Sequence, residues 1–158
     1  MKNTESAFYW IVGVLKNHKI PFQVSGGLAA RLYGSVRKLA DIDIDIPEDR
    51  FLDILSEVKD RVKFGPRRYQ DENWDLLLLT LTYEGQDIDL SGAYETKVFD
   101  KKKTQWVSIK DDFSTATLMN AYGLEVPVMN REELIRYKRT LARDVDEIDI
   151  IQMTSDKK

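Results

Sequence analysis

The chain has 158 residues, and 42% of them are apolar, which is enough to bury one continuous core in a single domain spanning residues 1–158. Its net charge is -3, from 24 basic and 27 acidic residues, so no overall field would hold it on nucleic acid or an anionic membrane. It contains no cysteine, which excludes disulfides and thiolate metal sites.

The first segment predicts an amphipathic helix over about residues 5–19. Apolar side chains recur there at helical spacing at Phe8, Ile11, Val12 and Leu15. Thr4 is a suitable N-cap, and His18 is expected to face solvent or to cap the end of this helix. The apolar run is too short and too interrupted to span a bilayer, and no small-residue cleavage site follows it. We therefore expect a cytoplasmic protein.

The next part of the chain predicts two strand-to-helix units. Pro21 ends the helical pattern, and residues 22–24 form a short apolar run before a Ser-Gly-Gly turn and a helix over 28–33. Residues 41–46 alternate between aspartate and isoleucine, which predicts a strand that Pro47 ends. A helix over 48–62 follows, with Phe51, Ile54, Leu55 and Val58 on one face.

The second half predicts hairpins and then helices. A first hairpin joins residues 75–83 to 87–90 through a Glu-Gly turn, and a lysine-rich loop at 100–104 precedes an apolar run at 106–109. A second hairpin pairs 117–121 with 124–129, and two helices are expected over 130–141 and 145–153. The domain thus divides into an N-terminal helix (4–19), a core (20–129) and C-terminal helices (130–153).

The aspartate–isoleucine strand is the most informative segment. Its side-chain period of two places Asp41, Asp43 and Asp45 on one face. Aspartate is a poor strand former, and three anions about 7 Å apart repel one another, so a merely solvated polar face would be better served by other residues. A bound divalent cation would resolve this conflict, and we expect a metal site here.

Known phosphate and metal motifs narrow the choice. A calcium loop starting at Asp41 would need glycine and glutamate where Ile46 and Leu52 stand, and neither a Walker A loop nor a G-x-G-x-x-G fingerprint occurs. Gly26 and Gly27 open a helix just upstream of the aspartates, where backbone N–H groups and the helix dipole attract an anion. Taken alone, such a glycine pair is more often a structural turn.

Together these motifs resemble the nucleotidyltransferases of the DNA-polymerase-β-like superfamily, in particular the branch of AbiEii-like and of lincosamide or aminoglycoside nucleotidyltransferases. Ser25-Gly26-Gly27-Leu28-Ala29-Ala30 is similar to the phosphate-binding turn of that branch, and Arg37-Lys38-Leu39-Ala40-Asp41-Ile42-Asp43 to its metal strand. Asp89, in Asp87-Ile88-Asp89-Leu90, is the better match to the third carboxylate, with Asp87 as its competitor. Leu39 departs from the Ser or Thr usual there. The late segment from Val126 through Lys138, Arg143 and Asp144 is also similar.

The resemblance implies an α+β fold, a small mixed sheet flanked by helices, and Mg-dependent transfer of a nucleoside monophosphate from a nucleoside triphosphate to a hydroxyl acceptor, either a small molecule or RNA. Asp41, Asp43 and Asp89 would hold two Mg²⁺ ions, with Mn²⁺ as the alternative metal, and would be the catalytic residues. Ser25, Gly26, Gly27, Arg37 and Lys138 would bind the triphosphate, although Arg37 and Lys138 are equally compatible with exposed residues that have no such role.

Other functions stay open. A nucleotide- or metal-binding module without turnover would use the same fold, as would an antitoxin-like module with a partner protein of the toxin–antitoxin type. A metal-dependent nuclease would use the same carboxylates. Lys101, Lys102 and Lys103, with Trp106 and the run Arg67-Arg68-Tyr69, would suit contacts to a nucleic-acid acceptor, but such clusters are more often solvated loops.

Overall fold

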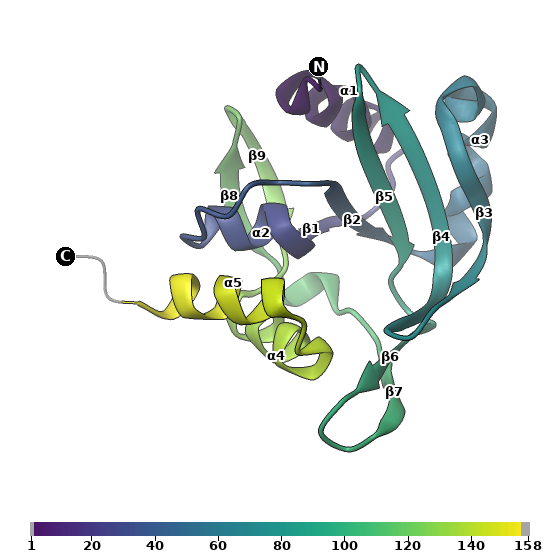
Figure 1. The fold of residues 1–158 in the computed structure, drawn as a ribbon. Coiled ribbons are helices and arrows are strands. Elements are labelled where there is room, and N and C mark those ends of the chain that lie inside the picture. The colour runs from purple at the N-terminus through teal and green to yellow at the C-terminus, as the bar shows by residue number, and fades with distance from the viewer. Residues whose placement is uncertain (1, 156–158) are drawn as a thin grey trace.

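A mixed sheet of nine strands runs through the computed structural model, which describes residues 2–155 (Figure 1). The strands are β1 (Gln23–Ser25), β2 (Ile42–Ile46), β3 (Val62–Gln70), β4 (Trp74–Tyr83), β5 (Gln86–Gly92), β6 (Thr96–Asp100), β7 (Gln105–Ile109), β8 (Thr117–Ala121) and β9 (Leu124–Val128). The α-helices are α1 (Thr4–Asn17), α2 (Gly26–Leu32), α3 (Phe51–Val58), α4 (Arg131–Leu141) and α5 (Asp144–Thr154). This is the single α+β domain with a mixed sheet that the sequence predicts.

The sheet brings sequence-distant strands together. Its order is β7-β6-β4-β5-β2-β1-β9-β8, and β3 pairs with β4 outside this path. The pairs β2–β5 and β1–β9 are parallel, whereas the other pairs are antiparallel. Because β2 pairs with β5 on one side and with β1 on the other, the two predicted aspartate strands lie side by side.

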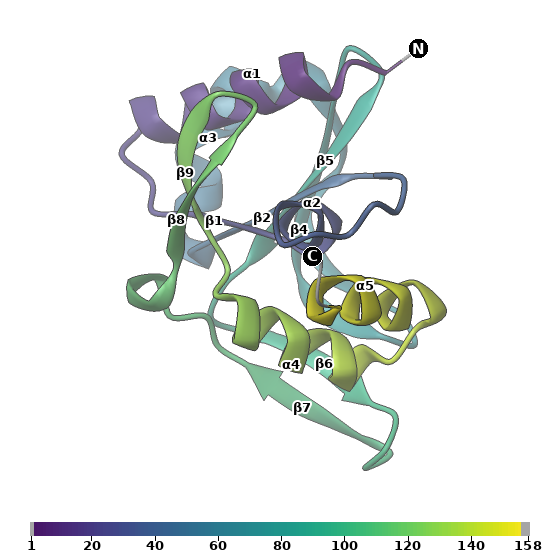
Figure 2. The same ribbon diagram turned by 90° about the vertical axis from the view of Figure 1, so that its left-hand side faces the viewer.

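The isoleucine face of β2 is the core face, as the alternation predicts. Ile42, Ile44 and Ile46 are fully buried and share one hydrophobic core with apolar side chains of α1 and α3, including Phe8 and Phe51. Burial of each such side chain contributes roughly 1.5–3 kcal/mol. Figures 1 and 2 show α1 and α3 at the upper part of the molecule and α4 and α5 together at the lower part.

Two strands were not predicted from the sequence, β3 and β6. β3 is an edge strand that pairs only with β4, and it contains Gly65-Pro66, a typical turn signal. An edge strand does not need the alternating pattern of a half-buried one, because much of its surface stays in water. The helix predicted over 48–62 is correspondingly shorter: α3 ends at Val58, and a 3₁₀ turn covers Lys59–Arg61.

The predicted cap of the first helix is wrong. Asn3 is the N-cap of α1, and its side chain accepts a hydrogen bond from the Ser6 N–H. The Thr4 hydroxyl instead donates to Gln86 Oε1 at 2.6 Å, which ties the start of α1 to β5. Both residues are good N-caps, so their neighbouring positions left the sequence ambiguous by one residue. Among residues 2–155 no helix has the length and apolarity needed to cross a membrane.

Candidate active site

All eight residues that the sequence nominates line one pocket of about 600 Å³. They are Ser25, Gly26, Gly27, Arg37, Asp41, Asp43, Asp89 and Lys138. They come from the end of β1 and the start of α2, from β2 and the segment leading into it, from strand β5 and from helix α4, which are separated by up to about a hundred residues in the chain. The fold therefore brings the predicted residues into one place, although their roles stay predictions.

A row of polar side chains crosses the sheet at the pocket floor. Asp43 on β2 is the register partner of Asp89 on the parallel strand β5. Ser25 on β1 is the partner of Asp43, and Thr80 on β4 is the partner of Asp89. Residues directly opposite one another in adjacent strands have Cβ atoms about 5 Å apart, so the two carboxylates are neighbours on one face.

Asp89 is held in place by Thr80. The Thr80 hydroxyl donates to Asp89 Oδ1 at 2.6 Å, which leaves the other carboxylate oxygen free of that contact. Asp87, its competitor, does not line the pocket, and both of its oxygens accept from Lys63 Nζ, at 3.0 and 2.9 Å. Of the two, Asp89 is therefore the carboxylate placed beside Asp43.

The carboxylates of the pocket conflict electrostatically. Burial, followed by the charges of Asp89, Asp41 and Asp45, raises the pKa of Asp43 to about 7. Burial also raises the pKa of Asp89, against the hydrogen bond from Thr80 that lowers it. Both shifts disfavour the charged forms, as expected where like charges are gathered away from water.

The side-chain oxygen atoms in the pocket are of the chemical type that binds magnesium. They are carboxylate and hydroxyl oxygens, the hard ligands that Mg²⁺ prefers. Within residues 2–155, no three carboxylate or imidazole side chains are arranged to enclose a metal ion. The three-carboxylate metal site thus stays a prediction, supported by the chemistry of the donors and by their burial.

The glycine turn lies directly against Asp43. Gly26 has φ +58°, and a Cβ atom there would lie 2.2 Å from Asp43 Oδ2. A Cβ on Gly27 would lie 3.2 Å from Arg37 Nη2. Glycine at 26 is therefore required by both its backbone conformation and its close approach to Asp43, which agrees with the structural turn that the sequence left open beside phosphate binding.

The Ser25 hydroxyl bonds a carboxylate of β2, and its role in phosphate binding stays a prediction. It donates to Asp45 Oδ1 at 3.0 Å and makes no side-chain cap on α2. Asp45 also accepts from Gln23 Nε2 at 3.2 Å. Burial, and then the neighbouring Asp45 charge, raises the pKa of Asp111, which favours the neutral form of this second carboxyl group beside Asp45. Asp45, whose role the sequence left open, thus belongs to a hydrogen-bonded cluster behind Asp43.

The predicted cations form a buried ion-pair network with α5. Lys138 is 1% exposed, and its Nζ lies 3.0 Å from Asp149 Oδ2 and 3.3 Å from Asp146 Oδ1. Arg37 binds Asp149 through Nε and Nη2, at 3.0 and 2.8 Å. Arg143 binds Asp146 in the same forked way, at 2.7 and 3.0 Å. Neither Arg37 nor Lys138 is the exposed, unpaired residue that the sequence left as an alternative.

Sequence reasoning missed the two aspartates of this network. Asp146 and Asp149 are spaced by three residues on α5, and both are fully buried. Acidic residues on a helix normally face water, so the spacing alone gave no reason to expect burial. The available signal was that α5 carries these aspartates on the same face as the buried Met153.

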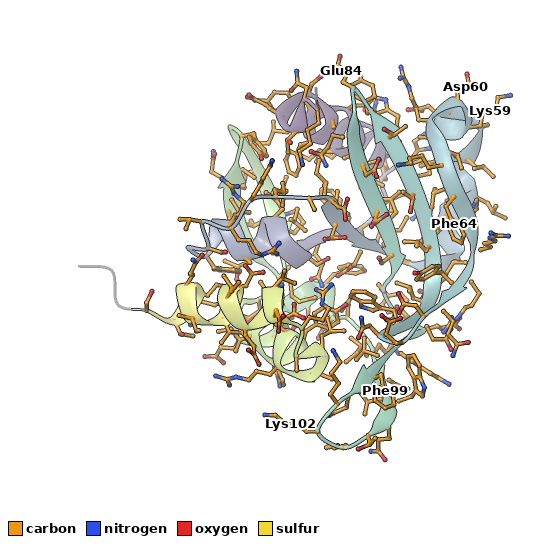
Figure 3. The ribbon with its side chains drawn as sticks, in the orientation of Figure 1. Lys59, Asp60, Phe64, Glu84, Phe99 and Lys102 are labelled. Atoms are coloured by element: carbon orange, nitrogen blue, oxygen red, sulfur yellow. The ribbon has the colours of Figure 1, made fainter. Side chains whose placement is uncertain are left out.

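The basic cluster that the sequence suggested is divided by the fold. Lys101–Lys103 form the turn between β6 and β7, far from the pocket lining, and Figure 3 shows Lys102 at this tip. Arg68 is paired with Asp75 at 2.6 Å, whereas Tyr69 lines the pocket. His18 is the C-cap of α1, and its ring contacts Glu57 at 3.0 Å, outside the pocket.

Comparisons with known proteins give a fold and no family. No family model and no curated protein matches the sequence. TM1012, a proposed nucleotidyltransferase of Thermotoga maritima, matches with TM-score 0.73 and 22% identity over 96% of this chain and 92% of that one. The lincosamide adenylyltransferase LnuA, solved with lincomycin, matches with TM-score 0.65 and 16% identity over 98% and 99%. ANT(2'')-Ia, solved with adenylyl-2''-tobramycin, matches with TM-score 0.60 and 16% identity over 94% of this chain and 86% of that one. This chain therefore has the nucleotidyltransferase fold over nearly its whole length.

Proposed function

We propose that the protein transfers a nucleoside monophosphate from a nucleoside triphosphate to a hydroxyl group. The observation that carries this proposal is the register pair of Asp43 and Asp89, which faces a Gly-Gly helix start in one pocket. A phosphate site at this turn and a cation site at these carboxylates would thus be adjacent, which is the arrangement that transfer at an α-phosphate needs.

The residues of the pocket would have distinct roles in the reaction. Asp41, Asp43 and Asp89 would hold two Mg²⁺ ions, which stabilise charge on the entering and leaving oxygens. The backbone N–H groups at Gly26 and Gly27 would bind the β- and γ-phosphates, because the Ser25 hydroxyl already donates to Asp45. Asp89, with one oxygen fixed by Thr80, would orient the acceptor hydroxyl and take its proton.

Arg37 and Lys138 would supply positive charge beside the phosphates. Their ion pairs with α5 fix both side chains before any ligand arrives, so little conformational entropy is lost on binding. Lys138 uses two of its three N–H donors for Asp146 and Asp149, and the third remains for the pocket that it lines. The acceptor would be a small molecule, as for LnuA and ANT(2'')-Ia, or RNA.

A melting screen tests the nucleotide site first. Each nucleoside triphosphate with Mg²⁺ should raise the melting temperature, because a ligand that binds only the folded state stabilises it. Gly27→Val should abolish this rise while the protein still folds, since its side chain meets the end of Arg37 rather than the backbone. Loss of folding and of binding together would favour a purely structural turn.

Pyrophosphate release tests turnover. Incubation with labelled triphosphate and candidate hydroxyl acceptors should transfer label and release pyrophosphate, and labelled DNA or RNA should stay uncut. Binding without release under every condition would support the non-catalytic module instead. Cleavage of nucleic acid without transfer would support the nuclease.

A further inference from the structure

The pocket has two chemically different sides, separated by Asp43 and Asp89. The cations that line it, Arg37, Lys138 and Arg143, belong to the side of α2, α4 and α5. On the opposite side, β3 and β4 contribute Phe64, Tyr69, Trp74, Leu76, Leu78 and Thr80 to the lining. The two sides meet at Trp74, because the Arg143 guanidinium lies 4.7 Å from the centre of its ring. This second side presents rings and aliphatic groups, with the Thr80 hydroxyl nearest to Asp89.

The register of the sheet extends the polar row to an aromatic ring. Phe64 on β3 is the partner of Thr80 on β4, which is itself the partner of Asp89 on β5. The row therefore runs from Asp43 through Asp89 and Thr80 to Phe64. Figure 3 shows Phe64 on β3, on the side of the molecule away from α5. The side lined by α2, α4 and α5 is the one assigned to the nucleotide phosphates. A ligand with its reacting hydroxyl at Asp89 then extends over β3 and β4.

The rings on this side form a preformed surface. Phe64 and Tyr69 contact edge to face, with ring centres 5.8 Å apart. The Arg67 guanidinium lies 4.5 Å from the centre of the Phe64 ring. Such an aromatic surface favours a flat or apolar ring, and the cation beside it disfavours a positively charged ligand.

Asp71, the carboxylate of the β3–β4 turn, already accepts hydrogen bonds from its neighbours. Asp71 accepts from the Tyr69 hydroxyl at 2.9 Å and from the backbone N–H groups of Asn73 and Trp74, both at 2.8 Å. These bonds outweigh burial and lower the pKa of Asp71. Asp71 therefore serves the β3–β4 turn and offers little to an ammonium group of a ligand.

We propose that β3 and β4 form the acceptor subsite, and that the acceptor is an uncharged hydroxyl compound with an aromatic or apolar ring beside the reacting hydroxyl. This rests on the proposed transfer reaction, because Asp89 marks the acceptor side only if it receives the acceptor's proton. A polyamine acceptor fits the subsite poorly, since Asp71, the one carboxylate that the β3–β4 segment contributes to the pocket within residues 2–155, is already hydrogen-bonded.

Saturation-transfer NMR tests the subsite directly. Phenyl β-D-glucoside, which has a ring and hydroxyls but no charge, should receive saturation from the protein loaded with Mg²⁺ and ATP, whereas protonated glucosamine should not. Phe64→Ala and Tyr69→Ala should each weaken the signal by about fivefold or more, from the loss of one aromatic contact. Tyr69→Phe keeps the ring and should retain binding. Tyr94→Ala, at an exposed tyrosine outside this pocket, is the control.

The affinity for Mg–ATP decides what occupies the subsite. It should stay within about twofold of the parent in Phe64→Ala and Tyr69→Ala, because the phosphates bind on the other side. A larger loss would show that the rings hold the nucleobase, and it would overturn the proposal. Absence of phenyl glucoside binding, or stronger binding of glucosamine, would also overturn it. Glucoside binding in a protein that fails to bind Mg–ATP would leave the subsite standing and sink the proposed transfer.

Discussion

Two regions of the pocket differ in how their charges are paired: the helical side, made by α4 and α5, and the strand side, made by the β2 and β5 carboxylates. On the helical side, buried charges are paired with opposite charges. Lys138 lies between Asp146 and Asp149, Asp146 binds Arg143, and Asp149 binds Arg37. On the strand side, Asp43 lies beside Asp89, and no cationic side chain of residues 2–155 forms an ion pair with either. Among the causes that shift the pKa of Asp43, the Lys138 charge lowers it.

This difference separates residues that stabilise the fold from residues that lower its stability. A buried, hydrogen-bonded ion-pair network resists the loss of any one partner, because the remaining charge would be left without compensation. Gathered carboxylates cost free energy until a cation binds. Substitutions on the helical side should therefore change stability first, and substitutions on the strand side should change activity first.

The strand side should give the largest effect on activity. Asp43→Asn removes a carboxylate that would contact both metal ions, so nucleotidyl transfer should fall by about 10³-fold or more. The fold should be intact or slightly more stable without metal, because a buried charge with a raised pKa is removed. Pyrophosphate release and thermal melts in EDTA measure the two effects. An Asp43→Asn protein that melts lower than the parent in EDTA, or keeps most of its activity, would show that Asp43 is structural.

The helical side should give the largest effect on stability. Lys138→Met removes the cation between Asp146 and Asp149 and should cost about 3 kcal/mol of unfolding free energy, or roughly 10 °C in melting temperature. Lys16→Met, at an exposed lysine of α1, is the control and should change the melting temperature little. Denaturant unfolding of the three proteins measures the difference. Equal stabilities of the parent and Lys138→Met would show that the network contributes no stability.

The strand side was predictable from the sequence, whereas the helical side was not. Aspartates alternating with isoleucines over residues 41–46 break the composition rules for a strand, and that conflict marked the site. Asp146 and Asp149 obey the rules for an exposed helix face, and only the docking of α5 against α2 and α4 buries them. That β2 lies beside β5 was expected only from the resemblance, which groups Asp89 with Asp41 and Asp43, because register between distant strands is set by tertiary packing.

Acid should weaken the helical side within a defined pH range. Burial raises the pKa of Asp149, but hydrogen bonds from Arg37, Ser35 and Lys138 outweigh it and lower the pKa to about 2. A carboxylate with a lowered folded-state pKa stabilises fully above its unfolded value near 4 and loses this contribution as the pH falls towards 2. The loss should be on the order of 2 kcal/mol. Urea unfolding between pH 5 and pH 2 should show a smaller decline for Asp149→Asn than for the parent, and parallel declines would refute the assignment.

The smallest effect should come from Asp87, two residues from Asp89 on the same strand face. Asp87 lies outside the pocket and pairs with the exposed Lys63, and exposed ion pairs contribute little to stability. Asp87→Asn should therefore keep transfer activity within about twofold of the parent, whereas Asp89→Asn should lose most of it. Both substitutions remove one negative charge, from positions two residues apart on β5. A difference in activity between the two variants therefore reports the position of the carboxylate rather than the loss of charge. Pyrophosphate release for both variants, at saturating Mg²⁺ and triphosphate, measures it. A large loss in Asp87→Asn with an active Asp89→Asn would identify Asp87 as the third carboxylate, and it would mean that the strand side rearranges when nucleotide binds.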